Sequence, residues 1–281
     1  MKIFNKKILI LLLIFIIILI NCRVSTENKL TEIQSNHPDI SWGYFGKKQK
    51  LFLVYTNCKD RNNQILIFIH GSPGGWKDYY KYLINNLLKS KFCIISLDRP
   101  GYGNSLPKES YPDLNIQAEL IINALEEFKS IYPNLNNKNI FVGHSYGGPV
   151  IASISNLTNK INAEFIFISS PIDPQLEELK WYNKLVANSL IQWIIPLELI
   201  HSNNEMLTLK EQLISLVKVW KPTNHKFKII HGTNDSLVPF DNIKYFKKHL
   251  GSYLLNSIEI QNENHFIPWT KMDIVLKTIT D

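Results

Sequence analysis

The sequence predicts an α/β fold, in which a mostly parallel sheet carries helices on both faces. Short apolar runs rich in Ile and Phe alternate along the chain with segments of helical periodicity, and such alternation is typical of parallel sheets. A chain of 281 residues, 45% of them hydrophobic, can also bury one large core. We therefore expect one domain with an insertion rather than two domains.

The expected strands are short apolar runs bounded by turn residues. Residues 40–45 and 51–56 form the first two, which a turn through Gly46, Lys47 and Lys48 joins. The other expected strands are residues 65–70, 92–98, 139–142, 165–169, 227–231 and 257–260.

Helices are expected between these strands. The segments 76–89 and 116–132 are the clearest, and the second has an apolar face formed by Ile116, Leu120, Ala124, Phe128 and Ile131. Further helices are expected over residues 149–155, over 241–250 with Gly251 as a stop, and over 269–280 with Pro268 at the start.

The interval between the strands ending near Ser169 and starting near Phe227 is too long for a simple crossover. We interpret residues 171–222 as an inserted lid, with a helix over residues 207–220. Residues 175–200 are crowded with large apolar side chains, and we expect these to pack the lid onto the core. The alternatives are an apolar wall for an acyl or aromatic substrate group, or a face that touches a membrane.

The first 22 residues form a targeting segment. Three lysines precede the apolar run Ile8–Ile20, which is too short for a membrane-spanning helix, and Asn21 and Cys22 follow it. This pattern resembles a bacterial lipoprotein signal, which implies lipid attachment at Cys22, although Asn21 departs from the small residue that such signals carry. An uncleaved membrane anchor and ordinary cleavage are the alternatives. All three place the globular part outside the cytoplasm. Lipid attachment and the uncleaved anchor would also attach it to a membrane.

The polar residues 23–39 are expected to form a tether, followed by the domain at 40–281. The formal net charge of +7 falls to +4 without the three lysines of the targeting segment, and the remaining basic residues are spread along the chain, so nucleic acid is not an expected partner. No His/Cys cluster has the spacing of metal ligands and no phosphate loop follows a strand. We therefore expect no metal and no organic cofactor.

The segment Gly143-His144-Ser145-Tyr146-Gly147-Gly148 follows an apolar strand and leads into an expected helix. This G-x-S-x-G pattern holds a serine exposed on a sharp turn, where the glycines permit close backbone approach. In this context the chain resembles the α/β-hydrolase superfamily, of the AB hydrolase-1 type, in which an acid and then a histidine follow the nucleophilic serine. The resemblance implies an eight-stranded sheet with the lid after the sixth strand, and Ser145 as the nucleophile.

Four further segments carry the same resemblance. His70-Gly71-Ser72-Pro73-Gly74-Gly75 resembles the HGxP-type oxyanion loop, which implies that the N–H groups of Ser72 and Tyr146 bind the oxyanion. The stretch from His231 to Pro239 resembles an HGxxDxxVP motif and implies Asp235 as the triad acid, with Asp173 as the alternative. In the loop 98–105, Asp98 and Arg99 are expected to organise a tight turn. The fourth segment, 262–266, contains His265.

His265 follows the last expected strand and matches the triad histidine of the superfamily. The chain has eight histidines, and their positions argue against the other seven. His70 and His231 end strands and are interpreted as structural, and the side chain of His144 is expected to point away from Ser145. The remaining ones lie in the tether, the lid, a loop or a helix surface: His37, His201, His225 and His249.

Cys58 and Cys93 permit two interpretations. Cys93 lies in an apolar strand and is typical of a buried thiol. In the strand order that the resemblance implies, the second and fourth strands are antiparallel neighbours, so a disulfide between the two cysteines is the alternative.

The resemblance spans residues 40–281 and implies a serine hydrolase that cleaves a small or acyl-chain carboxylic ester, expected to be monomeric. Haloalkane dehalogenases and epoxide hydrolases carry aspartate at the position of Ser145, so an acyl-serine pathway is favoured. A prolyl-type aminopeptidase or amidase is the first alternative, although the lid offers few acidic residues, chiefly Glu177 and Glu178. A non-catalytic lipoprotein scaffold is the second.

Overall fold

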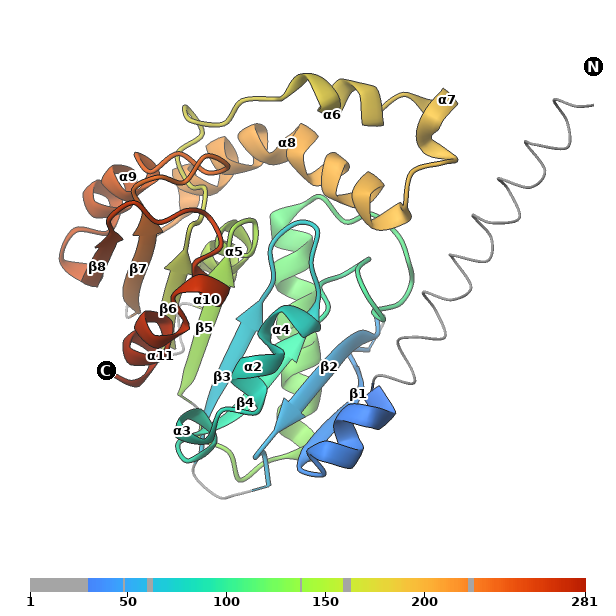
Figure 1. Ribbon diagram of the computed structural model, residues 1–281, viewed down its shortest axis with the longest axis vertical. Coiled ribbons are helices and arrows are strands. Elements are labelled where there is room, and N and C mark those ends of the chain that lie inside the picture. Colours follow the sequence, from blue (N-terminus) through green and yellow to red (C-terminus); the bar gives the residue numbers. More distant parts are fainter. Residues whose placement is uncertain (1–29, 48, 60–62, 137, 159–162, 222–224) are drawn as a thin grey trace, which may run out of the picture. The chain divides into compact units, whose positions relative to one another are not determined.

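The computed structural model describes residues 30–47, 49–59, 63–136, 138–158, 163–221 and 225–281 (Figure 1). The chain divides into two compact units, Met1–Ser41 and Trp42–Asp281. In the first unit residues 30–36 are helical, although the sequence predicted a tether without regular structure. The pair Leu30 and Ile33 has helical spacing, but one such pair is too little to reveal a helix in a polar segment. Cys22 and the targeting segment lie outside the described residues.

An eight-stranded sheet organises the fold, with the strand order β1-β2-β4-β3-β5-β6-β7-β8. Strand β2 runs antiparallel to β4, whereas β4, β3, β5, β6, β7 and β8 are parallel. The strands are β1 (Ile40–Phe45), β2 (Leu51–Thr56), β3 (Gln64–Ile69), β4 (Phe92–Leu97), β5 (Asn139–His144), β6 (Ala163–Ile168), β7 (Lys226–Gly232) and β8 (Leu254–Ile260). Every residue of β4, β5 and β6 is buried, as expected for central strands covered on both faces. The predicted α/β-hydrolase fold is therefore confirmed.

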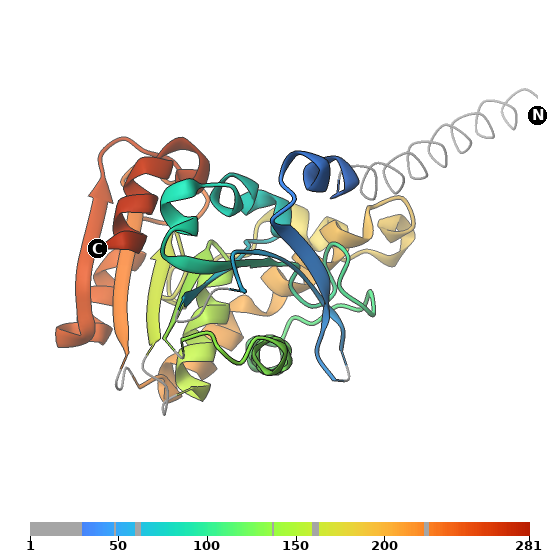
Figure 2. The ribbon, with the colours of Figure 1, turned by 90° about the horizontal axis from the view of Figure 1, so that it is seen from below.

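Helices cover both faces of this sheet (Figure 2). The long helices α4 (Leu114–Ile131) and α5 (Gly147–Leu157) lie on one face, and α2 (Tyr80–Leu83), α3 (Asn86–Lys89) and α11 (Met272–Thr280) lie on the other. The remaining elements outside the lid are η1 (Trp76–Tyr79), α9 (Asn242–Leu250), η2 (Gly251–Tyr253) and α10 (Ile267–Thr270). Gly251 ends α9 with a φ of 51°, in agreement with its predicted role as a stop.

Two helix predictions differ from the structure. The expected helix over 76–89 is divided into η1, α2 and α3, because Asn85 leaves the helical conformation and its side chain caps α3 by accepting the N–H of Leu88. On α4 the expected apolar face is rotated, since Ile116 and Ile131 are exposed. The face that is buried consists of Leu114, Gln117, Ala118, Ile121, Ala124, Leu125 and Phe128.

The lid lies between β6 and β7 and crosses the carboxyl ends of the parallel strands (Figure 1). It contains α6 (Trp181–Val186), α7 (Ser189–Gln192) and α8 (Leu197–Val219). Helix α8 is longer than the predicted helix over 207–220, because its first half buries polar side chains that give no apolar periodicity. The expectation that the large apolar residues of the lid pack onto the core is wrong for several of them, including Trp181, which is 78% exposed.

Cys58 and Cys93 form a disulfide. The antiparallel register of β2 and β4 pairs Thr56 with Ile94, which brings the residue after β2 to the start of β4. The two Cα atoms are 4.4 Å apart. Of the two interpretations that the sequence leaves open, the structure therefore favours the disulfide over the free thiol.

Candidate active site

The turn between β5 and α5 holds Ser145 in a strained conformation. Its φ is 51°, in the left-handed region that non-glycine residues adopt at a cost, often at functional sites. The glycines on either side are required by close packing. A Cβ on Gly143 would lie 2.5 Å from the carbonyl oxygen of Gly147, and one on Gly147 would lie 2.3 Å from that of Ile69. The backbone therefore explains the glycines of the G-x-S-x-G pattern.

The loop 70–75 lies directly against Ser145. A Cβ on Gly71 would be 3.0 Å from the Cβ of Ser145, so Ser72 follows at the edge of the nucleophile turn. Among the described residues, the backbone N–H groups of Ser72 and Tyr146 have no hydrogen-bond acceptor. The Tyr146 ring is buried and its hydroxyl donates to the carbonyl of Pro112, which fixes this residue. Both N–H groups are therefore available to an anion.

His265 and Asp235 are hydrogen-bonded to each other. His265 Nδ1 and Asp235 Oδ2 are 2.8 Å apart, and both side chains are buried. The other carboxylate oxygen, Oδ1, accepts the N–H groups of Leu237 and Val238 at 2.9 Å each. The alternative acid, Asp173, instead accepts the N–H of Gln175. Asp235 is therefore the acid that the structure brings to His265.

Two histidines that the sequence assigned no role in the site support this pair. His231 Nε2 lies 3.4 Å from Asp235 Oδ2. Burial raises the pKa of the Asp235 carboxyl, but hydrogen bonds from His231 and His265 outweigh burial and hold that pKa well below its usual range. The carboxylate is therefore ionised at neutral pH. Residue spacing alone gave no signal for this contact, because His231 ends its strand as many structural histidines do.

His144 connects the nucleophile turn to His265. Its Nε2 lies 3.0 Å from the backbone carbonyl oxygen of His265, and the two ring centroids are 4.8 Å apart. Burial, and then the neighbouring His265, lower the pKa of His144 to about 3, so its ring is neutral at physiological pH. Because Ser145 follows His144 directly, this contact joins the end of β5 that precedes Ser145 to the backbone of His265.

A buried ion pair connects the lid to the loop 98–105. Arg99 Nη1 lies 2.6 Å from Glu205 Oε1, and both side chains are almost fully buried. Glu205 also accepts hydrogen bonds from Gln117 Nε2 at 2.9 Å and from the hydroxyl of Tyr102 at 2.7 Å. The hydroxyl of Ser72 donates to the same carboxylate. One acidic side chain of α8 is thus shared by four groups of the core fold.

Arg99 also fixes the backbone that precedes Ser72. Its Nε donates to the carbonyl of His70 at 3.0 Å, and its Nη2 donates to that of Gly71 at 2.9 Å. The predicted turn is present as well, since Asp98 accepts the N–H groups of Trp76 and Asn104 at 2.8 and 2.7 Å. Burial raises the pKa of Asp98 to about 7. Arg99 therefore also holds the backbone of the loop 70–75, outside its own turn.

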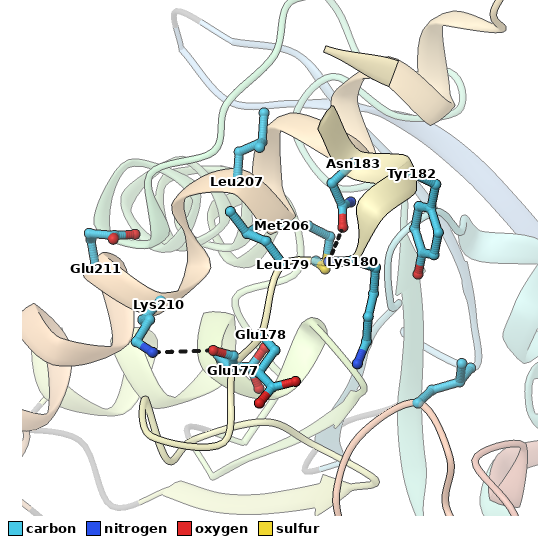
Figure 3. A pocket seen from close by; sticks show the side chains of 11 residues that line it. Glu177, Glu178, Leu179, Lys180, Tyr182, Asn183, Met206, Leu207, Lys210 and Glu211 are labelled. Atoms are coloured by element: carbon cyan, nitrogen blue, oxygen red, sulfur yellow. Dashed lines mark hydrogen bonds between the residues drawn. The ribbon is translucent and has the colours of Figure 1, made fainter. Parts of the chain in front are cut away.

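A cavity of ≈ 500 Å³ lies between the lid and the loop that follows β7 (Figure 3). Leu179, Met206, Leu207 and Leu237 give it apolar walls, and Leu237 also donates its N–H to Asp235. Tyr182 and Asn183 also line it, together with five charged side chains: Glu177, Glu178, Lys180, Lys210 and Glu211. Through Leu237, the cavity therefore borders the loop that carries Asp235.

The comparison with protein families identifies the fold family. The model of the alpha/beta hydrolase family matches residues 66–223, which is more than half of the chain. The chain belongs to the alpha/beta hydrolase family. Among curated relatives of this alpha/beta hydrolase, the kynurenine formamidase of Scheffersomyces stipitis is 25% identical over 241 residues, covering 74% of this chain and 85% of the relative. The AB hydrolase superfamily protein YisY of Bacillus subtilis is 27% identical over 226 residues, covering 65% and 78%.

Solved structures agree on the fold of this alpha/beta hydrolase. A putative aryl esterase from Burkholderia cenocepacia superposes with a TM-score of 0.63 at 17% identity, covering 86% of this chain and 97% of that one. Fold and relatives together support a hydrolase. Within the described ranges, no three His, Cys, Asp or Glu side chains are grouped to hold a metal ion. Among these same residues, no helix has the length and apolar character to cross a bilayer.

Proposed function

We propose that this alpha/beta hydrolase cleaves a carboxylic ester through an acyl-serine intermediate, with Ser145, His265 and Asp235 as its triad. The observation that carries the proposal is the 2.8 Å contact between His265 and Asp235, together with a serine held at positive φ on the turn whose His144 bonds the backbone of His265. A serine hydroxyl reacts when a neighbouring imidazole accepts its proton and a carboxylate orients that imidazole. The same arrangement occurs in acyl transfer on unrelated folds.

In the proposed reaction, Ser145 Oγ attacks the ester carbonyl carbon while His265 Nε2 takes the hydroxyl proton. The carbonyl oxygen becomes an oxyanion, which accepts the free N–H groups of Ser72 and Tyr146. Collapse of this intermediate expels the alcohol, to which His265 returns the proton. A water molecule then attacks the acyl-serine by the same steps and releases the carboxylic acid. The ionised Asp235 stabilises the imidazolium that forms in each half.

An amide is the second candidate substrate. A curated relative is named kynurenine formamidase, and an acyl-serine site can cleave an amide by the same steps. An aminopeptidase, which would have to bind the amine of its substrate, has weaker support. Burial raises the pKa of Glu177 to about 7 against the attraction of Lys180 and Lys210, so this carboxyl is only partly ionised at neutral pH and is a weak partner for an amine.

Active-site labelling tests the proposal. A fluorophosphonate probe should label wild-type protein at Ser145, and Ser145→Ala should abolish labelling and lower kcat by on the order of 10⁴-fold or more. Ser90→Ala, at an exposed serine that bonds only within its own turn, is the matched control and should be labelled normally. Labelling that survives Ser145→Ala would remove the nucleophile assignment. p-Nitrophenyl esters compared with formyl and aminoacyl arylamides would decide between ester and amide.

We also propose that Cys22 carries a lipid that attaches the chain to a membrane outside the cytoplasm. The support is the sequence alone: a basic start, an apolar run and then a cysteine. Cys22→Ser should release the protein from membranes after detergent-free lysis. Continued membrane association would favour an uncleaved anchor instead.

A further inference from the structure

Six large apolar side chains between residues 181 and 194 of the lid are exposed to solvent. We call them the apolar lid face: Trp181, Tyr182, Leu185, Leu190, Trp193 and Ile194. Trp181 and Leu190 are each 78% exposed, and Trp193 is 71% exposed. Helices α6 and α7, which carry most of these residues, contact each other at the outer side of the lid (Figure 1). Exposed apolar side chains gathered in one short segment indicate an interaction surface.

The polarity of α6 is inverted relative to a helix that packs on a core. Its buried residue is Asn183, which donates to Asn203 Oδ1 at 2.9 Å, and Asn203 Nδ2 donates back to the carbonyl of Asn183 at 3.1 Å. Polar groups therefore hold α6 to α8, while Trp181 and Leu185 face outward. The apolar residues of α6 are not what attaches it to the rest of the fold, so their exposure needs another explanation.

Within the segment that carries this face the charged side chains are lysines, while Glu177 lies near Lys180 at the adjoining cavity. Between Leu179 and Leu197 the sequence contains Lys180 and Lys184 and no acidic residue, and both lysines are exposed. Such a surface complements an anionic one. A second copy of the chain is a poorer partner, because a symmetric contact would bring the lysines of both copies together without an acid from this segment.

We propose that the apolar lid face binds the surface of an anionic phospholipid bilayer. Trp and Tyr favour the membrane–water interface, since their rings are apolar and carry a polar N–H or O–H group. Trp193 Nε1 is already satisfied by the carbonyl of Leu190, so its ring can enter the interface without an unpaired donor. Lysines beside the apolar residues reach the lipid phosphates while their stems stay in the apolar layer. This proposal requires no assumption about the substrate.

Quenching by brominated lipids tests this contact in the full chain. The protein would be incorporated into vesicles of phosphatidylcholine, alone or with an equal part of phosphatidylglycerol, with or without bromine on the acyl chains. In the mixed vesicles, bromine should lower wild-type tryptophan fluorescence by up to about one third, because Trp181 and Trp193 are two of six tryptophans. The double variant Trp181→Ser/Trp193→Ser should lose this decrease, and Lys180→Gln/Lys184→Gln should weaken it.

The matched control removes apolar surface elsewhere. Leu87→Ser/Leu157→Ser alters two exposed leucines of α3 and α5 and should leave the quenching unchanged. Equal quenching of wild type and the tryptophan double variant would overturn the proposal, because an N-terminal anchor alone would then explain the quenching. Equal quenching with and without phosphatidylglycerol would overturn the anionic preference. A blue shift of wild-type fluorescence on concentrating the protein without lipid would instead assign the face to a second copy.

Discussion

Replacing Glu205 with alanine should lower the free energy of unfolding far more than a substitution on the surface of a helix would. In Glu205→Ala the guanidinium of Arg99 stays fully buried but loses its only carboxylate partner among the described residues. Removing one member of a buried ion pair costs about 3–5 kcal/mol. Because Arg99 keeps Gln117 Oε1 at 2.7 Å and two backbone carbonyls, we expect a loss near the lower end of this range. With a urea m-value of about 2 kcal/mol/M, the unfolding midpoint should fall by roughly 1.5 M.

Urea unfolding followed by far-UV circular dichroism would measure this loss under non-reducing conditions. Glu211→Ala, at an exposed position of the same helix, is the control and should change the unfolding free energy by less than about 0.5 kcal/mol. A double-mutant cycle adds Arg99→Met and Arg99→Met/Glu205→Ala, and the double variant should cost clearly less than the sum of the two single ones. A loss below about 1 kcal/mol for Glu205→Ala, or an additive cycle, would refute the view that this pair is buried and coupled.

Three further results are expected. Gly147→Ala should abolish fluorophosphonate labelling, because its Cβ would lie 2.3 Å from a backbone oxygen of β3, whereas Gly43→Ala, whose Cβ would meet only the Phe45 ring at 3.1 Å, should be labelled normally. Serine at both Cys58 and Cys93 should lower the free energy of unfolding by about 4 kcal/mol, from the 35-residue separation, and reduced wild type should match this variant in urea unfolding. Burial raises the pKa of Glu177 from 4.5 to about 7, so the folded state binds this proton more tightly than the unfolded state, and stability decreases as pH rises through that window. Thermal unfolding of Glu177→Gln should therefore show its largest gain over wild type above pH 7 and little gain near pH 4.

The parts of the site that the sequence predicts are those set by local backbone demands. Gly143 and Gly147 are required wherever a strand turns sharply into a helix, and the structure shows the close contacts that exclude a Cβ. Asp235 and His265 follow β7 and β8, and parallel neighbouring strands bring their carboxyl ends together. Each of these residues could be located from a short segment and the order of the strands.

Glu205 could not be located in this way. It lies 106 residues from Arg99 in the sequence. From the sequence alone, a charged residue on a helix is expected to face solvent. The same reasoning failed for Gln117, which is buried on α4 because it bonds both Arg99 and Glu205. Periodicity assumes that buried faces are apolar, and a polar network in the interior leaves no periodic signal. The rotated apolar face of α4 and the missed first half of α8 have this common cause.

The lid departs from the expected pattern for the same physical reason. On α8, Asn203 holds α6 through a pair of amide hydrogen bonds, and two residues later Glu205 holds Arg99 and the hydroxyl of Ser72. Polar contacts therefore fasten α6 and the first half of α8 on their inner side, whereas Leu209, Leu213 and Leu216 of the second half of α8 pack in the core. Trp181 and Leu185 of α6 stay outside. The surface that we propose binds lipid and the loop that we propose binds the oxyanion are thus attached to one helix, through side chains less than one turn apart.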